Sequence, residues 1–234
     1  MILLSQQIRQ EIDEIIKMIN SNSEKIAQIL LKINAVTLNP SQPYRYASGI
    51  LSPVYTDCRM VISFPKERKI VRDGYIEMIK EAGDFDVIAG TSTAGIPHAA
   101  FIAEKMGLPM VYVRGRGKMK DHGKGKLIEG VVKKGDKVAI IEDLISTAES
   151  SLDTATTLRE AGCKVTHVFA ITTYGMAKSV QNLNENKLKL KNLTSFEETV
   201  KMAEKLKMIS EDEKQIVLEW TKDTAGWGKK MGYE

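Results

Sequence analysis

The segment Val138–Ser150 constrains this chain more than any other part of its 234 residues. The apolar residues Val138–Ile141 predict a strand that ends in two acids, Glu142 and Asp143. A short loop of small and hydroxyl residues follows, and then a helical pattern runs over Ser151–Ala161. A strand, a tight loop and a helix N-terminus in this order form a phosphate site, because loop N–H groups and the helix dipole favour an anion. Two carboxylates beside such a cradle suit the hydroxyls of a ribose.

The composition is typical of one α/β domain. The hydrophobic fraction of 43% is sufficient for a full core at this length. No apolar run approaches the roughly 18 residues of a membrane span, and acids soon follow the N-terminal apolar residues, unlike in a signal peptide. The two cysteines, Cys58 and Cys163, have neither metal nor redox spacing. We therefore predict a cytoplasmic protein without a membrane partner.

Strand and helix patterns alternate along the chain. The spacing predicts helices at residues 24–33, 65–82, 96–106, 176–185, 195–206 and 210–223, and strands at 86–89, 110–113, 138–141, 165–173 and 188–190. Such alternation predicts a mostly parallel central sheet with helices on both faces. We expect one domain over residues 23–234, with a β-hairpin region at Tyr44–Asp57.

Residues 1–22 are predicted to form an N-terminal helical extension. Isoleucines recur there at helical spacing, at positions 8, 12, 15, 16 and 19. The acids and bases of this segment nearly balance, so it does not resemble a basic DNA-binding module. The extension is therefore expected to be a packing or dimer element.

Candidate ligand loops follow three successive predicted core strands. They are Gly90–Gly95, the segment that starts at Arg114, and Glu142–Ser150. Because the carboxyl ends of parallel strands meet at one edge of a sheet, we expect these loops to form one site. The loop Gly90–Gly95 fits either an anion contact or an ordinary tight turn.

The segment Arg114–Gly125 contains four glycines and six basic residues, counting His122. The span Arg114–Lys137 has a net charge of +6, whereas the rest of the chain has −2, which indicates an anionic partner at this place. A basic loop beside a phosphate site suits a lid that closes over a leaving pyrophosphate. A solvated surface run is the alternative. Nucleic-acid binding is disfavoured because no aromatic residues interleave with the bases.

These motifs together resemble a known family. The acid pair and its loop resemble the phosphoribosyl-diphosphate (PRPP) motif of type I phosphoribosyltransferases. Two further regions resemble the catalytic loop and the N-terminal substrate hood of orotate phosphoribosyltransferases. The loop residues are Arg116, Lys120–Gly123 and Ile128–Gly130, and the hood residues are Tyr46–Gly49 and Ser52–Tyr55. The resemblance spans about Ser23 to the C-terminus.

The resemblance implies a type I phosphoribosyltransferase fold with a small N-terminal hood. It also implies transfer of the phosphoribosyl group of PRPP to orotate, giving orotidine 5′-monophosphate and pyrophosphate in pyrimidine biosynthesis, with Mg²⁺ as cofactor. The implied PRPP-binding residues are Arg116, Lys120, His122, Glu142, Asp143, Leu144, Ile145, Ser146, Thr147, Ala148, Glu149 and Ser150.

Within this set, the resemblance assigns catalytic roles to Lys120, His122 and Asp143, and an orotate contact to Ser146. It assigns no metal ligand among the side chains, because Mg²⁺ would be held mostly by substrate and water. It implies a homodimer in which each basic loop reaches the neighbouring subunit's site.

The chain departs from the family pattern at several positions. Some family members have lysine at the positions of Ala47 and Ala94, a basic residue at Gly117, and an arginine that holds orotate at Tyr174. These departures leave the orotate contacts open. Arg114 competes with Arg116 for the loop arginine, and the distance in sequence to His122 favours Arg116. The alternative functions are transfer to another nucleobase and PRPP binding by a non-enzymatic regulator.

Overall fold

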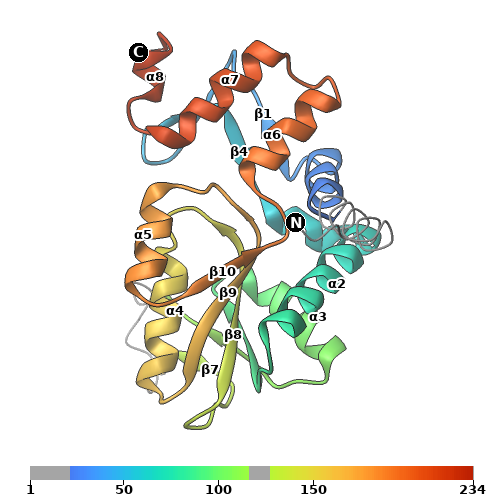
Figure 1. Cartoon of the computed structure of the whole chain (residues 1–234), viewed down its shortest axis with the longest axis vertical. Coiled ribbons are helices and arrows are strands. Elements are labelled where there is room, and N and C mark those ends of the chain that lie inside the picture. Colours follow the sequence, from blue (N-terminus) through green and yellow to red (C-terminus); the bar gives the residue numbers. More distant parts are fainter. Residues whose placement is uncertain (1–21, 116–126, 234) are drawn as a thin grey trace, which may run out of the picture.

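A six-stranded sheet forms the centre of the computed structural model, which describes residues 22–115 and 127–233 (Figure 1). Five neighbouring strands are parallel, and only the edge strand β7 runs antiparallel to its neighbour. The predicted mostly parallel sheet is therefore confirmed. In spatial order the strands are β10 (Lys189–Asn192), β9 (Lys164–Thr173), β8 (Lys137–Ile145), β5 (Val87–Thr91), β6 (Met110–Val113) and β7 (Ile128–Glu129).

Helices cover both faces of this sheet (Figure 1). Alternate residues of β8 explain why: Ala139 and Ile141 pack toward α2 and α3, whereas Val138 and Ile140 pack toward α4. Side chains of a strand point to opposite faces in turn, so a strand that is apolar throughout is buried on both sides. The helices are α2 (Pro65–Ala82) and α3 (Gly95–Met106) on one face, and α4 (Glu149–Glu160) and α5 (Ala177–Glu185) on the other.

The N-terminal hood consists of a helix over residues 22–32, two small antiparallel sheets and one 3₁₀ helix. The predicted hairpin at Tyr44–Asp57 is only partly correct. Its first half pairs around Gly49, whose φ of +88° suits the turn. Its second half pairs instead with residues 36–38, for which no strand was predicted. The elements are β1 (Val36–Leu38), β2 (Tyr44–Arg45), β3 (Leu51–Ser52), β4 (Val54–Thr56) and η1 (Cys58–Ser63).

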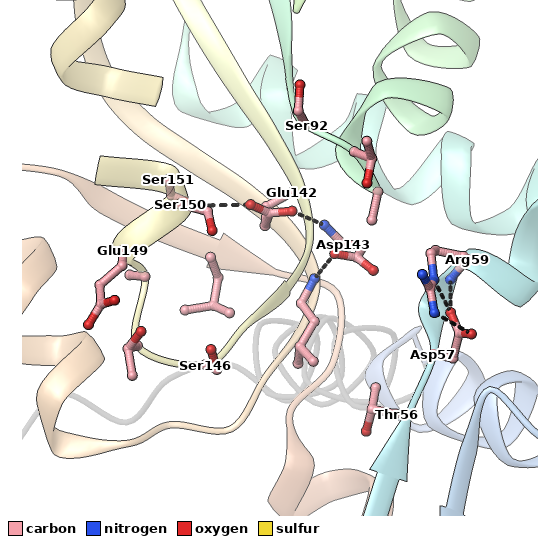
Figure 2. Close-up of a pocket in the computed structure, with 16 residues that line it drawn as sticks. Thr56, Asp57, Arg59, Ser92, Glu142, Asp143, Ser146, Glu149, Ser150 and Ser151 are labelled. Atoms are coloured by element: carbon pink, nitrogen blue, oxygen red, sulfur yellow. Dashed lines mark hydrogen bonds and ion pairs between the residues drawn. The ribbon is translucent and has the colours of Figure 1, made fainter. Parts of the chain in front are cut away.

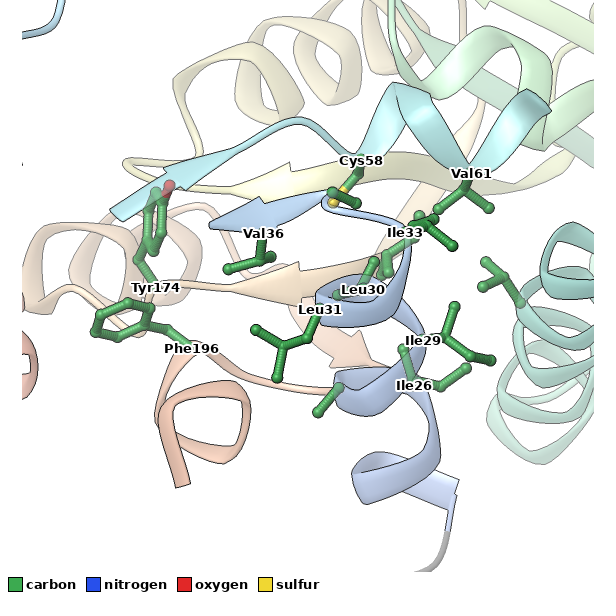
Figure 3. Packing of buried hydrophobic residues seen from close by; sticks show 14 of the residues in the cluster. Ile26, Ile29, Leu30, Leu31, Ile33, Val36, Cys58, Val61, Tyr174 and Phe196 are labelled. Atoms are coloured by element: carbon green, nitrogen blue, oxygen red, sulfur yellow. The ribbon is translucent and has the colours of Figure 1, made fainter. Parts of the chain in front are cut away.

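The C-terminal helices are far from the hood in sequence, but they pack against it and complete it. The indole Nε1 of Trp220 donates to the backbone oxygen of Leu51 at 3.1 Å, which fixes the C-terminal region to β3. Tyr174 and Phe196 extend the same core to the helix over residues 22–32 (Figure 3). The C-terminal elements are α6 (Phe196–Lys205), α7 (Glu211–Glu219), η3 (Trp220–Lys222) and α8 (Trp227–Lys230).

Two predictions concern segments that the structure leaves undescribed. The helical extension predicted for residues 1–22 lies outside the described residues, apart from residue 22, and so do residues 116–126 of the basic loop. Within the described residues, no helix combines the length and the apolar character needed to cross a membrane.

Candidate functional site

A pocket of about 300 Å³ opens at the carboxyl ends of β5 and β8 (Figure 2). Every residue of the predicted run Glu142–Ser150 lines it, together with part of the loop after β5 and three residues of the hood. The structure thus brings together two of the three loops that were expected to converge. The lining residues are Thr56, Asp57, Arg59, Ser92, Thr93, Ala94 and Glu142–Ser151.

The acid pair lies within β8 and not beyond its end, so the prediction that the strand ends at Ile141 is wrong. β8 continues to Ile145 because it keeps pairing with β9 after its other neighbour, β5, has ended. The last register pair of β8 with β5 is Ile141 with Gly90. The edge of β8 beyond that pair is therefore open, and it faces the pocket at Glu142 and Asp143.

Glu142 is held in place by the surrounding backbone and by one hydroxyl. Its carboxylate accepts hydrogen bonds from the Asp143 N–H at 3.2 Å and from the Ser151 hydroxyl at 3.4 Å. The Tyr75 hydroxyl donates to the backbone oxygen of Glu142 at 2.6 Å, so α2 supports the strand from below. Burial, and then the neighbouring charge of Asp143, raise the pKa of Glu142 well above its ordinary value.

Asp143 turns its carboxylate toward the open side of the pocket (Figure 2). One of its oxygens accepts from the Leu144 N–H at 2.8 Å. Burial also raises the pKa of Asp143, although the hydrogen bonds around it act in the opposite direction. Two adjacent carboxyls with raised pKa values are unfavourable in their charged form when no ligand is bound. Hydroxyl donors or a cation would stabilise that form, so the pair favours such a ligand.

The loop from β8 to α4 presents an uncapped helix N-terminus to the pocket. Ala148 occupies the N-cap position with a φ of +68°, and no side chain there bonds to the first turn. The first N–H groups of a helix have no partners within the helix, so those of α4 are available to an anion. The exposed hydroxyls of Ser146 and Ser150 lie beside them.

A second helix N-terminus meets the same pocket from the loop after β5. Ser92, Thr93 and Ala94 line the pocket, and α3 begins at Gly95 without a side-chain cap. The Ser92 hydroxyl donates to the backbone oxygen of Val113 at 2.6 Å, which ties this loop to β6. Two uncapped helix N-termini with an acid pair between them can hold two phosphate groups of one ligand.

The hood contributes residues that the sequence reasoning missed. Thr56, Asp57 and Arg59 line the pocket opposite Ser146 (Figure 2). The Arg59 Nε lies 2.6 Å from Asp57 Oδ1, and Arg59 Nη2 lies 2.8 Å from Oδ2. This pairing lowers the pKa of Asp57. Their position directly after the hood motif Ser52–Tyr55 was the signal that could have identified them.

The remaining residues that were considered for the site from the sequence either do not line the pocket or lie outside the described residues. Arg116, Lys120 and His122 belong to residues 116–126 and lie outside the described residues. Arg114 forms an ion pair with Glu129 at 2.6 Å. Tyr174 is buried against the rings of Phe196 and Trp220 at centroid distances of 5.6 and 5.2 Å. Tyr174 stands at the position for which a ligand-binding arginine was considered, and its ring belongs to the hydrophobic core and not to the lining of the pocket.

Residues 64–205 match the phosphoribosyl transferase domain family. Over 210 residues the chain is 46% identical to orotate phosphoribosyltransferase from Listeria monocytogenes serotype 4b, which covers 89% of this chain and 100% of that protein. The chain belongs to the orotate phosphoribosyltransferase family.

Solved structures agree with this family assignment. UMP synthase from Leishmania donovani superposes with a TM-score of 0.72 at 26% identity, covering 86% of this chain and 42% of that chain. Orotate phosphoribosyltransferase from Aeropyrum pernix gives a TM-score of 0.68 at 25% identity, covering 79% and 99%. The predicted type I phosphoribosyltransferase fold is confirmed.

The acid pair of this orotate phosphoribosyltransferase family member fits a magnesium ion held mainly by substrate. Within residues 22–115 and 127–233, no group of three or more His, Cys, Asp and Glu side chains gathers to hold a metal. Glu142 and Asp143 offer carboxylate oxygens, and a cation would stabilise the charged forms that burial disfavours when it raises their pKa values. Mg²⁺ commonly takes one or two carboxylates and completes its shell with phosphate oxygens and water.

Replacing Glu142 with Gln should stabilise the free protein at neutral pH. The pKa of Glu142 in the folded state lies above its ordinary value near 4.5. The folded state therefore binds more protons between these two values, and stability falls as pH rises through that window. Glu142→Gln removes this loss, worth about 1.4 kcal/mol per unit of pKa elevation. Thermal unfolding should give the variant the higher Tm at about pH 8, and a smaller difference at about pH 4.

Glu104→Gln, on the exposed side of α3, is the matched control and should leave Tm unchanged at both pH values. A Glu142→Gln protein no more stable than wild type at the higher pH would contradict the description of Glu142 as a buried acid with a raised pKa.

Proposed function

We propose that this chain transfers the phosphoribosyl group of PRPP to orotate, with the pocket between β5, β8 and the hood as its active site. The observation that carries the proposal is the convergence of two uncapped helix N-termini on one acid pair. The family assignment supports the choice of orotate. Loss of orotate absorbance with PRPP and Mg²⁺ tests it, and no loss with orotate but turnover of uracil or a purine would favour a different nucleobase.

The geometry supports a specific placement of PRPP. The 5′-phosphate lies at Ser146–Ser150 and the N-terminus of α4, and the pyrophosphate lies at Ser92–Ala94 and the N-terminus of α3. Glu142 and Asp143 lie between the two anion sites and accept from the ribose hydroxyls or from water on Mg²⁺. Because the anion sites are preformed by backbone N–H groups, charge that moves to the departing pyrophosphate meets donors already in place.

The cofactor and the assembly are parts of the same proposal. Mg²⁺, when bound, neutralises charge on the pyrophosphate and ribose oxygens. Arg116, Lys120 and His122 supply positive charge from the basic loop, and the protein works as a homodimer in which each loop serves the neighbouring site. The ion pair of Arg114 with Glu129 supports Arg116 as the loop arginine, because Arg114 is already engaged. A cytoplasmic location stays a prediction.

Arg59 is our candidate for the group that recognises the orotate carboxylate. It is the only Lys or Arg among the described residues that line the pocket, which otherwise contains four acids. Asp57 engages its Nε and Nη2 and holds the guanidinium in place. A guanidinium has five N–H donors, so others remain for a ligand. Tyr174 cannot supply this charge.

Arg59→Ala should reduce kcat/KM for orotate by about 10-fold to 150-fold, the equivalent of one lost hydrogen bond to a charged group. The KM for PRPP should change little, because the phosphate sites lie on other loops. Steady-state kinetics with each substrate varied in turn measures both. Arg59→Lys should recover part of the loss, since it keeps the charge but not the planar fork.

Arg45→Ala is the control, because Arg45 lies in the hood but does not line the pocket. It should leave both constants near wild type. A rise in the KM for PRPP with unchanged orotate kinetics in Arg59→Ala would show that Arg59 binds the pyrophosphate.

A further inference from the structure

A second cavity, of about 450 Å³, lies on the outer side of α2 and shares no lining residue with the candidate active site. Its walls come from α2, from the start of the helix over residues 22–32 and from the end of β10. We call it the α2 groove. It is lined by Asn22, Ser23, Lys25, Ile26, Ile70, Asp73, Gly74, Glu77, Met78, Glu81, Asn192 and Leu193.

The α2 residues of this groove form a single helical stripe. They lie at positions 70, 73, 74, 77, 78 and 81, so they follow the i, i+3, i+4 and i+7 spacing of one helix face. Ile70 and Met78 give that face an apolar centre, and both remain partly exposed. Gly74 lies between them, and the Leu193 side chain packs over it, since a Cβ at position 74 would lie 2.8 Å from Leu193 Cδ2. Such a face can pack against another helix.

The segment before residue 22 has a matching pattern. Its isoleucines, at positions 8, 12, 15, 16 and 19, lie at helical spacing and span 12 residues, as does the groove stripe from Ile70 to Glu81. Each span corresponds to about 16 Å of helix. A helix of this length is marginal in water by itself, so it needs an apolar surface against which to pack.

The chain connectivity places this segment at the groove. Asn22 and Ser23 are themselves lining residues, so the segment before residue 22 is covalently attached at the wall of the cavity. The Ser23 hydroxyl donates to the Thr194 Oγ1 at 3.2 Å, which fixes the entry point beside the end of β10. Only two residues lie between Ile19 and Asn22. The local concentration of the segment at the groove is therefore high.

We propose that residues 1–21 occupy the α2 groove of their own chain as an amphipathic helix, with the isoleucine stripe on Ile70, Met78 and Leu193. The inner side of α2 carries Tyr75, which supports Glu142, so the docked segment braces the outer side of the helix that supports the acid pair. The proposal concerns folding and packing and does not depend on the reaction that the pocket performs.

A double-mutant cycle in the full chain tests the contact. Ile12→Asp and Met78→Asp should each lower Tm by several degrees, and the double variant should lose clearly less than the sum, because both changes remove the same contact. Met208→Asp is the control: Met208 is 53% exposed between α6 and α7, and its effect should add to that of Ile12→Asp.

Deletion of residues 1–20 provides an independent measurement. The deletion should increase hydrogen exchange of α2 over residues 70–81, and in that shortened chain Met78→Asp should have little further effect on Tm. Additive effects in the cycle, or unchanged exchange of α2, would overturn the proposal. Coupling that disappears on dilution, with a matching fall in molecular mass by light scattering, would also overturn it, because the groove would then bind a second copy.

Discussion

Asp143→Asn should reduce kcat/KM for PRPP by roughly 30-fold to 1,000-fold, which corresponds to about 2–4 kcal/mol of lost transition-state stabilisation. The substitution keeps the shape of the side chain and removes its charge. The Leu144 N–H donates to Asp143 Oδ1 at 2.8 Å, and an amide oxygen can accept that bond as well. In the proposed placement of PRPP, the loss therefore reports the charge toward the ribose and the cation, and not a change of fold.

The control for this charge removal is Asp153→Asn, an exposed acid on α4 outside the pocket. It should leave kcat/KM unchanged. Initial rates at varied PRPP with saturating orotate and Mg²⁺ measure the effect, and circular dichroism verifies the fold. An Asp143→Asn protein with wild-type kcat/KM for PRPP would contradict the assignment of Asp143 to the active site.

Gly95→Ala should both destabilise the protein and reduce its activity about 100-fold. A Cβ at position 95 would lie 2.3 Å from the backbone oxygen of Ile141, far inside contact distance. The N-terminus of α3 must then move away from β8, at the residue before Glu142. Overpacking of this kind costs about 1–3 kcal/mol. A displacement of about 1 Å between catalytic groups can cost 100-fold in rate.

Thermal unfolding and steady-state kinetics test both parts of this prediction. Tm should fall by roughly 2–12 °C, given about 2–4 °C per kcal/mol for a chain of this size. Gly115→Ala is the control for stability, because a Cβ there would meet no atom of the described residues within 4 Å. An unchanged Tm and unchanged kcat in Gly95→Ala would show that α3 does not rest on β8 as closely as described.

Several parts of the fold follow from local sequence alone. The bounds predicted for Pro65–Ala82 and Met110–Val113 are confirmed, because Pro at the first helical turn and an apolar run of strand length are local signals. The run Glu142–Ser150 was placed in the site for the same reason. A strand, a loop and a helix in direct succession bring their residues together without help from distant parts of the chain.

Pairing between distant segments could not be inferred in this way. β4 pairs with β1 and not within the predicted hairpin, and two-residue strands such as β7 have too few residues to show a period. The extra length of β8 depends on β9, which continues to pair with it beyond the end of β5. Each of these features is decided by which strand lies alongside, and a sequence pattern does not contain that information.

The sequence by itself determined the residues of the proposed phosphate and ribose sites, since those residues lie in short continuous segments. Only the tertiary structure decided which hood residues face those segments. It buried Tyr174 against Phe196 and Trp220 and brought Arg59 to the pocket instead. The physical reason is that aromatic burial depends on C-terminal helices packing on an N-terminal hood. Such contacts are stabilised by the removal of apolar surface from water. No regular spacing in the sequence shows which distant residues contribute that surface.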